Sequence, residues 1–254
     1  MRGLLGETFH LLATHLHLFT LISLTVWLPG HVLRNYFEFF GAPQEGPVQS
    51  LQALLTIQIA LDPLVVSATL SALGRIKQGL PVGYGSAMTL GVAAWGRLLL
   101  VRFVINCAVA LPALGALFVG TGQSARGLAA GVLLLGLAAL IVILLVRFAV
   151  VDSVVVLEGA HALGAWRRAA ALTAGRRWRI WWTLVLLFLV VLSFAILVAQ
   201  VFRMAPELNH FIVRVLFDCA VAVSQSLFTI ALFLLYWRAR AGEGAPPPAP
   251  AAAS

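Results

Sequence analysis

The segment WRIWWTLVLLFLVVLSFAILVAQVF, residues 178–202, decides the fold class of this chain. It holds a single charged residue, Arg179, and it is longer than the ~20 apolar residues that an α-helix needs to cross ~30 Å of hydrocarbon. The whole chain shares this character, because 61% of its 254 residues are hydrophobic and 10% are charged, whereas soluble domains carry roughly 25% charged residues. A membrane β-barrel would instead show short segments of alternating hydrophobicity. We therefore predict an all-α integral membrane protein.

Six apolar runs predict six transmembrane helices. They cover roughly residues 18–40, 51–73, 97–119, 128–151, 178–202 and 209–236. Within the first run, Pro29 and Gly30 predict a kink or an early end. Eleven of the Lys and Arg residues that flank the runs lie on the side that holds both termini, and four lie on the other side. The positive-inside rule then predicts that both termini are cytoplasmic.

Three amphipathic segments precede the odd-numbered runs and predict helices that lie in the membrane interface. The segments align at an offset of 79 residues, which brings three glycines into register: Gly6, Gly85 and Gly164. The shared order of interfacial helix, span and span predicts three tandem units within a membrane domain, 1–240. These units cover about 1–78, 79–157 and 158–240. Residues 241–254 have no apolar period and predict a disordered cytoplasmic tail.

The stretch between the fourth and fifth runs is both basic and patterned. With the start of the fifth run it holds five arginines and four tryptophans. Arginines beside an anionic membrane attract its lipids by on the order of 1 kcal/mol each, and tryptophan suits the headgroup layer. The same residues would also serve as a topology signal and an anchor, so both interpretations stay open. The candidates for contact with lipid headgroups are Arg167, Arg168, Arg176, Arg177, Arg179, Trp166 and Trp178.

Several polar residues fall inside the predicted spans. Burying a carboxylate at the bilayer centre costs about 2.5–3.5 kcal/mol on insertion scales, so each acid should face the bundle and have a partner. One interpretation is a small proton- or ion-coupled secondary transporter that uses Asp62 and Asp218. The other is hydrogen bonding between helices, with Arg102 reaching a carboxylate. The predicted intramembrane polar cluster is Asp62, Asn106, Asp218, Arg102, Gln58 and Gln225.

The segment after the fourth run resembles part of a known membrane domain. The matching elements are Val155–Gly159, Ala165–Arg168, Leu172-Thr173 and Gly175-Arg176. They resemble the membrane domain of bacterial glycerophosphoryl diester phosphodiesterases and related uncharacterised six-span bacterial membrane proteins. Nothing in this sequence resembles the His-Arg-Gly and acidic metal-ligand motifs of the catalytic barrel of those enzymes. The resemblance, which covers about 30 residues, therefore implies a membrane module and does not transfer an enzymatic activity. It also implies that the protein lies in the inner (plasma) membrane of a bacterium.

Other classes of function lack a motif in the sequence. There is no phosphate-binding glycine loop, metalloprotease motif or nucleophile elbow, and we predict no cofactor and no metal site. The net charge of +8 is distributed beside apolar runs, which favours membrane lipid over nucleic acid as the partner. The leading hypothesis is a non-enzymatic multi-pass membrane module that engages anionic lipid or a partner protein at the cytoplasmic face. Assembly into a homo-oligomer is a further alternative.

Overall fold

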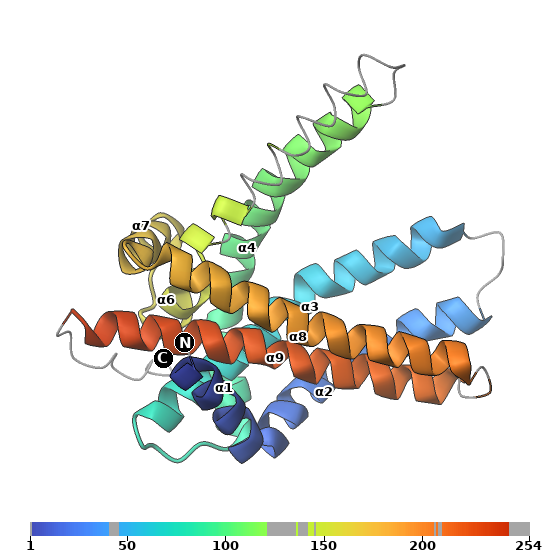
Figure 1. Cartoon of the computed structure of the whole chain (residues 1–254), viewed down its shortest axis with the longest axis horizontal. Coiled ribbons are helices and arrows are strands. Elements are labelled where there is room, and N and C mark those ends of the chain that lie inside the picture. Colours follow the sequence, from blue (N-terminus) through green and yellow to red (C-terminus); the bar gives the residue numbers. More distant parts are fainter. Residues whose placement is uncertain are drawn as a thin grey trace.

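The computed structural model of the chain describes residues 2–40, 46–120, 136, 142–144, 146–205, 207 and 210–243. All regular structure within these ranges is helical, which confirms the predicted all-α class (Figure 1). The helices are α1 (Arg2–Thr14), α2 (Leu16–Phe40), α3 (Gly46–Lys77), α4 (Tyr84–Gly120), α6 (Val151–Leu157), α7 (Ala162–Thr173), α8 (Arg177–Met204) and α9 (Phe211–Ala241).

Five of the described helices contain stretches that are long and apolar enough to cross a membrane. These stretches are Leu16–Phe40, Gln58–Lys77, Tyr84–Cys107, Arg177–Met204 and Phe211–Ala241. Length and composition thus support a membrane-embedded, multi-pass helical protein. The fourth predicted run, 128–151, lies largely outside the described residues, so five of the six predicted spans have a counterpart here.

Helix α9 is central to the packing and contacts α1, α2, α3 and α8. Its fully buried Phe233 and Tyr236 belong to the same hydrophobic core as Phe19 of α2. Helix α8 runs beside α9 in Figure 1 and turns large apolar side chains outward. Phe188 is 57% exposed and Leu197 is 62% exposed. Such an apolar surface suits contact with hydrocarbon rather than with water.

Helices α3 and α4 approach each other closely through small residues. The hydroxyl of Ser67 in α3 donates a hydrogen bond of 2.8 Å to the carbonyl oxygen of Gly91 in α4. A Cβ atom added at Gly91 would lie 2.7 Å from both the Cα and the Cβ of Ala68. Small residues at such crossings allow helix backbones to pack directly on each other, as is typical of membrane proteins.

Two helices differ from the sequence expectation because they continue where a break was expected. The interfacial helix and third span expected for the second unit form one helix, α4, with no break at Gly96. Gly175, the aligned glycine of the third unit, instead has φ 72° and follows the end of α7. Glycine adopts both the helical and the left-handed conformation with little strain, so a glycine at these aligned positions does not by itself predict where a helix ends. Helix α2 likewise continues through Pro29 to Phe40, so the early end expected there is wrong.

Ordered structure also continues beyond the predicted C-terminal boundary. Helix α9 ends at Ala241, and a carboxylate oxygen of Glu243 lies 2.6 Å from Nη2 of Arg168. The rest of the predicted tail, 244–254, lies outside the described residues.

One end of the bundle, which we call the basic end, is where α3 and α9 end and where α1 and α7 join them. Glu7 of α1 connects these elements, because its two carboxylate oxygens lie 2.6 Å from Nζ of Lys77 and 2.5 Å from Nη2 of Arg238. At the opposite end, the ring of Phe40 in α2 lies 5.7 Å from that of Phe211 in α9. The first helix and the end of the last helix therefore lie at the same end of the bundle.

Candidate functional site

The chain turns sharply between α7 and α8. Helix α7 ends at Thr173, and Gly175 takes a left-handed φ of 72°, a region that favours glycine. The hydroxyl oxygen of Thr173 lies 3.0 Å from the carbonyl oxygens of Arg147 and Ala169, which fixes the end of α7 against the segment before α6. In Figure 1 α7 is seen nearly along its axis while α8 runs across the view. The turn places the basic start of α8 beside the end of α9.

A pocket of about 200 Å³ lies between this turn, the last turns of α9 and the start of α1. Three arginines line it: Arg176, Arg179 and Arg238. The rest of its wall is mainly apolar and includes Leu4 and Ile180, both buried. A cationic cavity with an apolar wall suits an anion that carries apolar substituents.

The three arginines of the pocket differ in how their charge is balanced. Arg238 forms the ion pair with Glu7. Among the residues that the structure describes, neither Arg176 nor Arg179 has a carboxylate within ion-pair distance. Nη2 of Arg176 would lie 3.0 Å from a Cβ added at Gly242, so this guanidinium lies against the C-terminal end of α9. The partial negative charge at that helix end stabilises a nearby cation without neutralising it.

The carboxylate that pairs with Arg238, that of Glu7, is held in its charged form. Burial alone would raise the pKa of Glu7, but hydrogen bonds from Lys77 and Arg238, with their positive charges, outweigh it and lower that pKa below its ordinary value. Glu7 is therefore ionised at neutral pH and keeps Arg238 oriented toward α1. Glu7 and Arg238 lie 231 positions apart, so no local pattern in the sequence predicts their ion pair.

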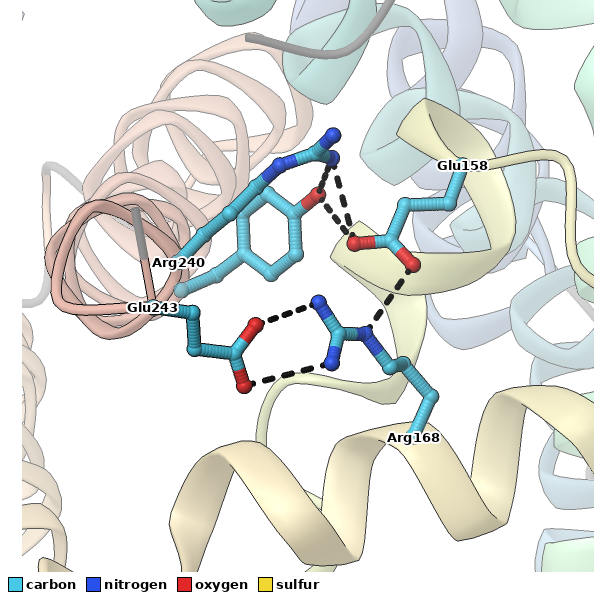
Figure 2. Close-up of polar contacts among 5 residues, drawn as sticks. Glu158, Arg168, Arg240 and Glu243 are labelled. Atoms are coloured by element: carbon cyan, nitrogen blue, oxygen red, sulfur yellow. Dashed lines mark hydrogen bonds and ion pairs between the residues drawn. The ribbon is translucent and has the colours of Figure 1, made fainter. Parts of the chain in front are cut away.

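Arg168 has a structural role at the basic end rather than a place in the pocket (Figure 2). We define the Glu158 cluster as Glu158, Arg168, Tyr236, Arg240 and Glu243. Glu158 accepts hydrogen bonds from Nε of Arg168 at 3.3 Å, from the hydroxyl of Tyr236 at 2.8 Å and from Nη1 of Arg240 at 3.1 Å. Arg168 also donates to both carboxylate oxygens of Glu243, at 3.2 and 2.6 Å. Hydrogen bonding to Glu243 is the main cause of the raised pKa of Arg168. The cluster fixes α7 to the end of α9 and so positions the pocket.

The other predicted headgroup residues are placed in two ways. Arg167 and Arg177 are exposed and lie outside the pocket lining. Trp178 is 70% exposed and packs edge to face on Trp182, with ring centroids 5.6 Å apart. Trp166 instead lies half-buried with its ring centroid 6.0 Å from that of Phe148. Trp178 is thus available to the headgroup layer, whereas Trp166 belongs to the packing of α7.

Arg102 connects three helices through two acids. Its guanidinium is ion-paired with Asp62 of α3, the partner that the sequence suggested. Nη2 of Arg102 also lies 2.6 Å from Oδ2 of Asp152 in α6, a residue that the sequence analysis did not single out. Asp152 is the second residue of α6, directly after the end of the fourth predicted run. Its position in the sequence does not predict a contact with Arg102. The hydrogen bonding between helices proposed for Arg102 is confirmed.

Asp218 belongs to a different group of helices from Asp62. Its carboxylate accepts a hydrogen bond of 2.7 Å from Nδ2 of Asn35 in α2, and Nη1 of Arg34 lies 3.8 Å away. The described contacts of Asp62 are with α4 and those of Asp218 are with α2, so the predicted polar residues do not form a single cluster. The remaining members of the predicted cluster, Gln58, Asn106 and Gln225, are exposed side chains.

The residues that carry the resemblance to the phosphodiesterase membrane domain lie at the basic end. Val155–Leu157 complete α6, Glu158 and Gly159 follow it, and Ala165–Arg168 lie in α7. Gly159 has a φ of 68°, so a glycine is favoured where the chain leaves α6. Glu158 and Arg168 are members of the Glu158 cluster, which gives this part of the pattern a structural basis. Comparison with protein-family models, curated proteins and solved structures gives no match.

Proposed function

We propose that this protein is a non-enzymatic multi-pass membrane module whose basic end faces the cytoplasm and binds anionic lipid headgroups. The observation that carries the proposal is the pocket in which Arg176 and Arg179 have no described carboxylate partner. A cation at the membrane surface that lacks an internal counter-ion attracts an external one, and anionic lipids are the most abundant source there. A partner protein with an acidic surface is the alternative ligand that the experiment below separates.

The surroundings of the pocket support a position in the headgroup layer. Exposed Arg167 and Arg177 add positive charge on either side of the α7–α8 turn. Exposed Trp178 places an amphipathic ring one residue further along. Arginine and tryptophan together are typical of membrane interfaces, where the ring contacts both apolar and polar phases. Binding to lipid and anchoring of the topology therefore use neighbouring residues, but the pocket is a feature that anchoring does not require.

The three-unit architecture forms part of the proposal. Helices α1, α2 and α3 of the first unit correspond in order and approximate length to α7, α8 and α9 of the third. In both units a short helix at the basic end precedes two long apolar helices. Both short helices, α1 and α7, contact α9. The pocket lies where the first and third units meet.

The contacts of the intramembrane acids favour this module over a transporter. The transport interpretation requires Asp62 and Asp218 to serve one pathway. The first is paired with Arg102, and the second is held by Asn35. Two acids that form their ion pairs and hydrogen bonds with different neighbouring helices are explained by helix packing.

The test measures lipid retention by native mass spectrometry of protein released from mild detergent. A variant in which Arg167, Arg176, Arg177 and Arg179 are replaced by Gln should lose at least about tenfold of its retained anionic lipid, given about 1 kcal/mol per charge. The matched control replaces the same four residues by Lys, which keeps the charge and the topology signal. Arg168 is left in place because it belongs to the Glu158 cluster.

Insertion must be verified in the same preparations, since four charges also contribute to topology. Reporters fused after Ser254 and inserted near Gln123 should report opposite sides of the membrane in every variant. Equal retention of anionic lipid by the correctly inserted Gln variant and the parent would contradict the proposal. Loss of an acidic protein partner with unchanged lipid would assign the basic end to protein binding instead.

A further inference from the structure

We propose that the pocket between α1, the α7–α8 turn and the end of α9 binds a phosphate monoester at the end of a lipid headgroup. This proposal rests on the proposed function, because it specifies which anion one defined site at the basic end recognises. Its support lies in the size, the charge and the lining of the pocket.

The size of the pocket limits what it can enclose. Its volume of about 200 Å³ is well above the roughly 10–15 Å³ that admits one water molecule and below the ~300–1,000 Å³ typical of sites that enclose drug-sized ligands. A phosphate with a few attached atoms suits this volume. The acyl chains of a lipid would remain outside, along the exposed apolar surface of α8.

The charge of the pocket favours a monoester over a diester. Arg176 and Arg179 supply two positive charges that no described carboxylate balances, while Arg238 shares the carboxylate of Glu7 with Lys77. A phosphate monoester carries about −1.5 to −2 charges at pH 7, which matches two guanidinium groups, whereas a phosphodiester carries one. The planar guanidinium forms paired hydrogen bonds with phosphate oxygens. The start of α8 at Arg177 adds the partial positive charge of a helix N-terminus, and the end of α9 beside Arg176 adds a partial negative charge that opposes it.

The apolar lining strengthens the interaction of these arginines with a ligand, and its hydroxyl groups leave recognition of the phosphate to the arginines. Leu4, Ile180 and Leu235 are at most 8% exposed, so they exclude water from one wall. Interactions between charges strengthen where water is excluded. The two hydroxyl groups of the lining are already engaged, because Thr173 and Thr183 lie 3.0 and 2.9 Å from backbone carbonyl oxygens. Recognition of the phosphate therefore falls to the arginines.

Glu7 acts as an internal competitor of the ligand. Its carboxylate oxygen lies 2.5 Å from Nη2 of Arg238, a residue of the pocket lining. A bound phosphate would compete with this carboxylate for Arg238. Replacing Glu7 by Gln should release the third arginine to the ligand, and binding should tighten. Removal of the acid and removal of a pocket arginine thus have opposite expected effects.

The experiment compares single variants of the full-length protein in a neutral detergent titrated with defined lipids, with bound lipid counted by native mass spectrometry. The probes are phosphatidic acid, a monoester, and phosphatidylglycerol, a diester. Phosphatidic acid should bind the parent at least about fivefold more tightly than phosphatidylglycerol. Arg176→Gln and Arg179→Gln should each weaken phosphatidic acid about fivefold, as expected for one arginine beside a charged lipid.

One matched control and one variant of opposite expected effect separate the pocket from its surroundings. Arg177→Gln removes the same charge from the same turn, but Arg177 is outside the lining, so it should weaken phosphatidic acid less than Arg176→Gln or Arg179→Gln does, and it should weaken both lipids alike. Glu7→Gln should tighten phosphatidic acid about fivefold.

Each contrary outcome overturns a defined part of the inference. Equal losses for the variants at positions 176, 177 and 179 would refute the pocket and leave the proposed function standing. No loss for any of them would refute both. Equal affinity for the two lipids would refute the preference for a monoester. Displacement of phosphatidic acid by inorganic phosphate or glycerol 3-phosphate at equal concentration would show that the pocket takes its phosphate from solution, and would refute the lipid source.

Discussion

Arg102 offers a sharp test of what the acids within the helices do. The ion pair with Asp62 and the 2.6 Å contact with Asp152 give two carboxylates one shared cation. The side chains of Arg102 and Asp152 are 24% and 19% exposed, so both are substantially desolvated. Replacing Arg102 by Gln leaves two facing carboxylates without a counter-ion. Replacing Asp62 by Asn leaves the cation paired with Asp152.

The expected losses of stability for these two substitutions differ accordingly. Breaking a buried ion pair by removing one partner costs about 3–5 kcal/mol, because the remaining charge is left unbalanced. We expect Arg102→Gln to destabilise the protein by about this amount. Asp62→Asn should cost about 1 kcal/mol or less, since Asp62 is 39% exposed and its amide replacement still accepts a hydrogen bond. Adding Asp62→Asn and Asp152→Asn to Arg102→Gln should restore most of the loss, because neutral groups require no counter-ion.

The assay is denaturant-induced unfolding in detergent micelles, followed by circular dichroism for the four proteins under one condition. Stability of Arg102→Gln equal to that of Asp62→Asn would refute the shared-cation reasoning. The same Asp62→Asn protein also tests the transport alternative. A folded variant that loses a proton-dependent flux in proteoliposomes would assign Asp62 a transport role and not a packing role.

Three further predictions concern packing and the basic end. Gly91→Ala should destabilise the protein by about 1–3 kcal/mol, because the new Cβ would overlap the backbone of α3. Gly96→Ala, where a Cβ has open space, should not destabilise it. Equal unfolding midpoints for the two variants would contradict this prediction. The protection of α1 against hydrogen exchange, taken relative to the intrinsic exchange rate at each pH, should fall as pH falls below 4.5. Glu7 has a lowered folded pKa, so its stabilisation is full above the ordinary value and is lost as the carboxyl is protonated. Glu7→Gln should remove that dependence, and an unchanged protection profile in the parent would refute it. Arg168→Gln should raise hydrogen exchange in α7 more than Glu243→Gln does, because Arg168 also loses its contact with Glu158.

The helices were largely predictable because each depends on local composition. The run 178–202 lies within α8, Arg177–Met204, and the run 18–40 lies within α2, Leu16–Phe40. An apolar segment of this length has few alternatives in a membrane, where its backbone must hydrogen-bond internally. The break after α7 and the continuity of α4 were less predictable. Both depend on how neighbouring helices pack around a glycine, which can extend a helix or end it.

The candidate site was only partly predictable because its partners are distant in the chain. Sequence grouped five arginines by proximity, yet Arg168 is paired with Glu243, which lies 75 positions away. Arg238 enters the pocket from the last helix and is oriented by Glu7 from the first. Proximity in sequence identifies a basic surface, but the fold decides which of its charges are balanced. Helices α1 and α7, which lie far apart in the sequence, both contact α9.

Arg176 and Arg179 have no described acidic partner because the acids of the basic end pair with other cations. Glu7 joins α1 to Lys77 and Arg238, while Glu158 joins the end of α6 to α7 and α9. Each acid thus fixes a short helix at the basic end to the ends of longer ones, and its one charge is shared between two cations. Arg176 and Arg179 lie between these two connections, where no described acid reaches. The same arrangement that holds the basic end together therefore leaves two adjacent arginines for an external anion.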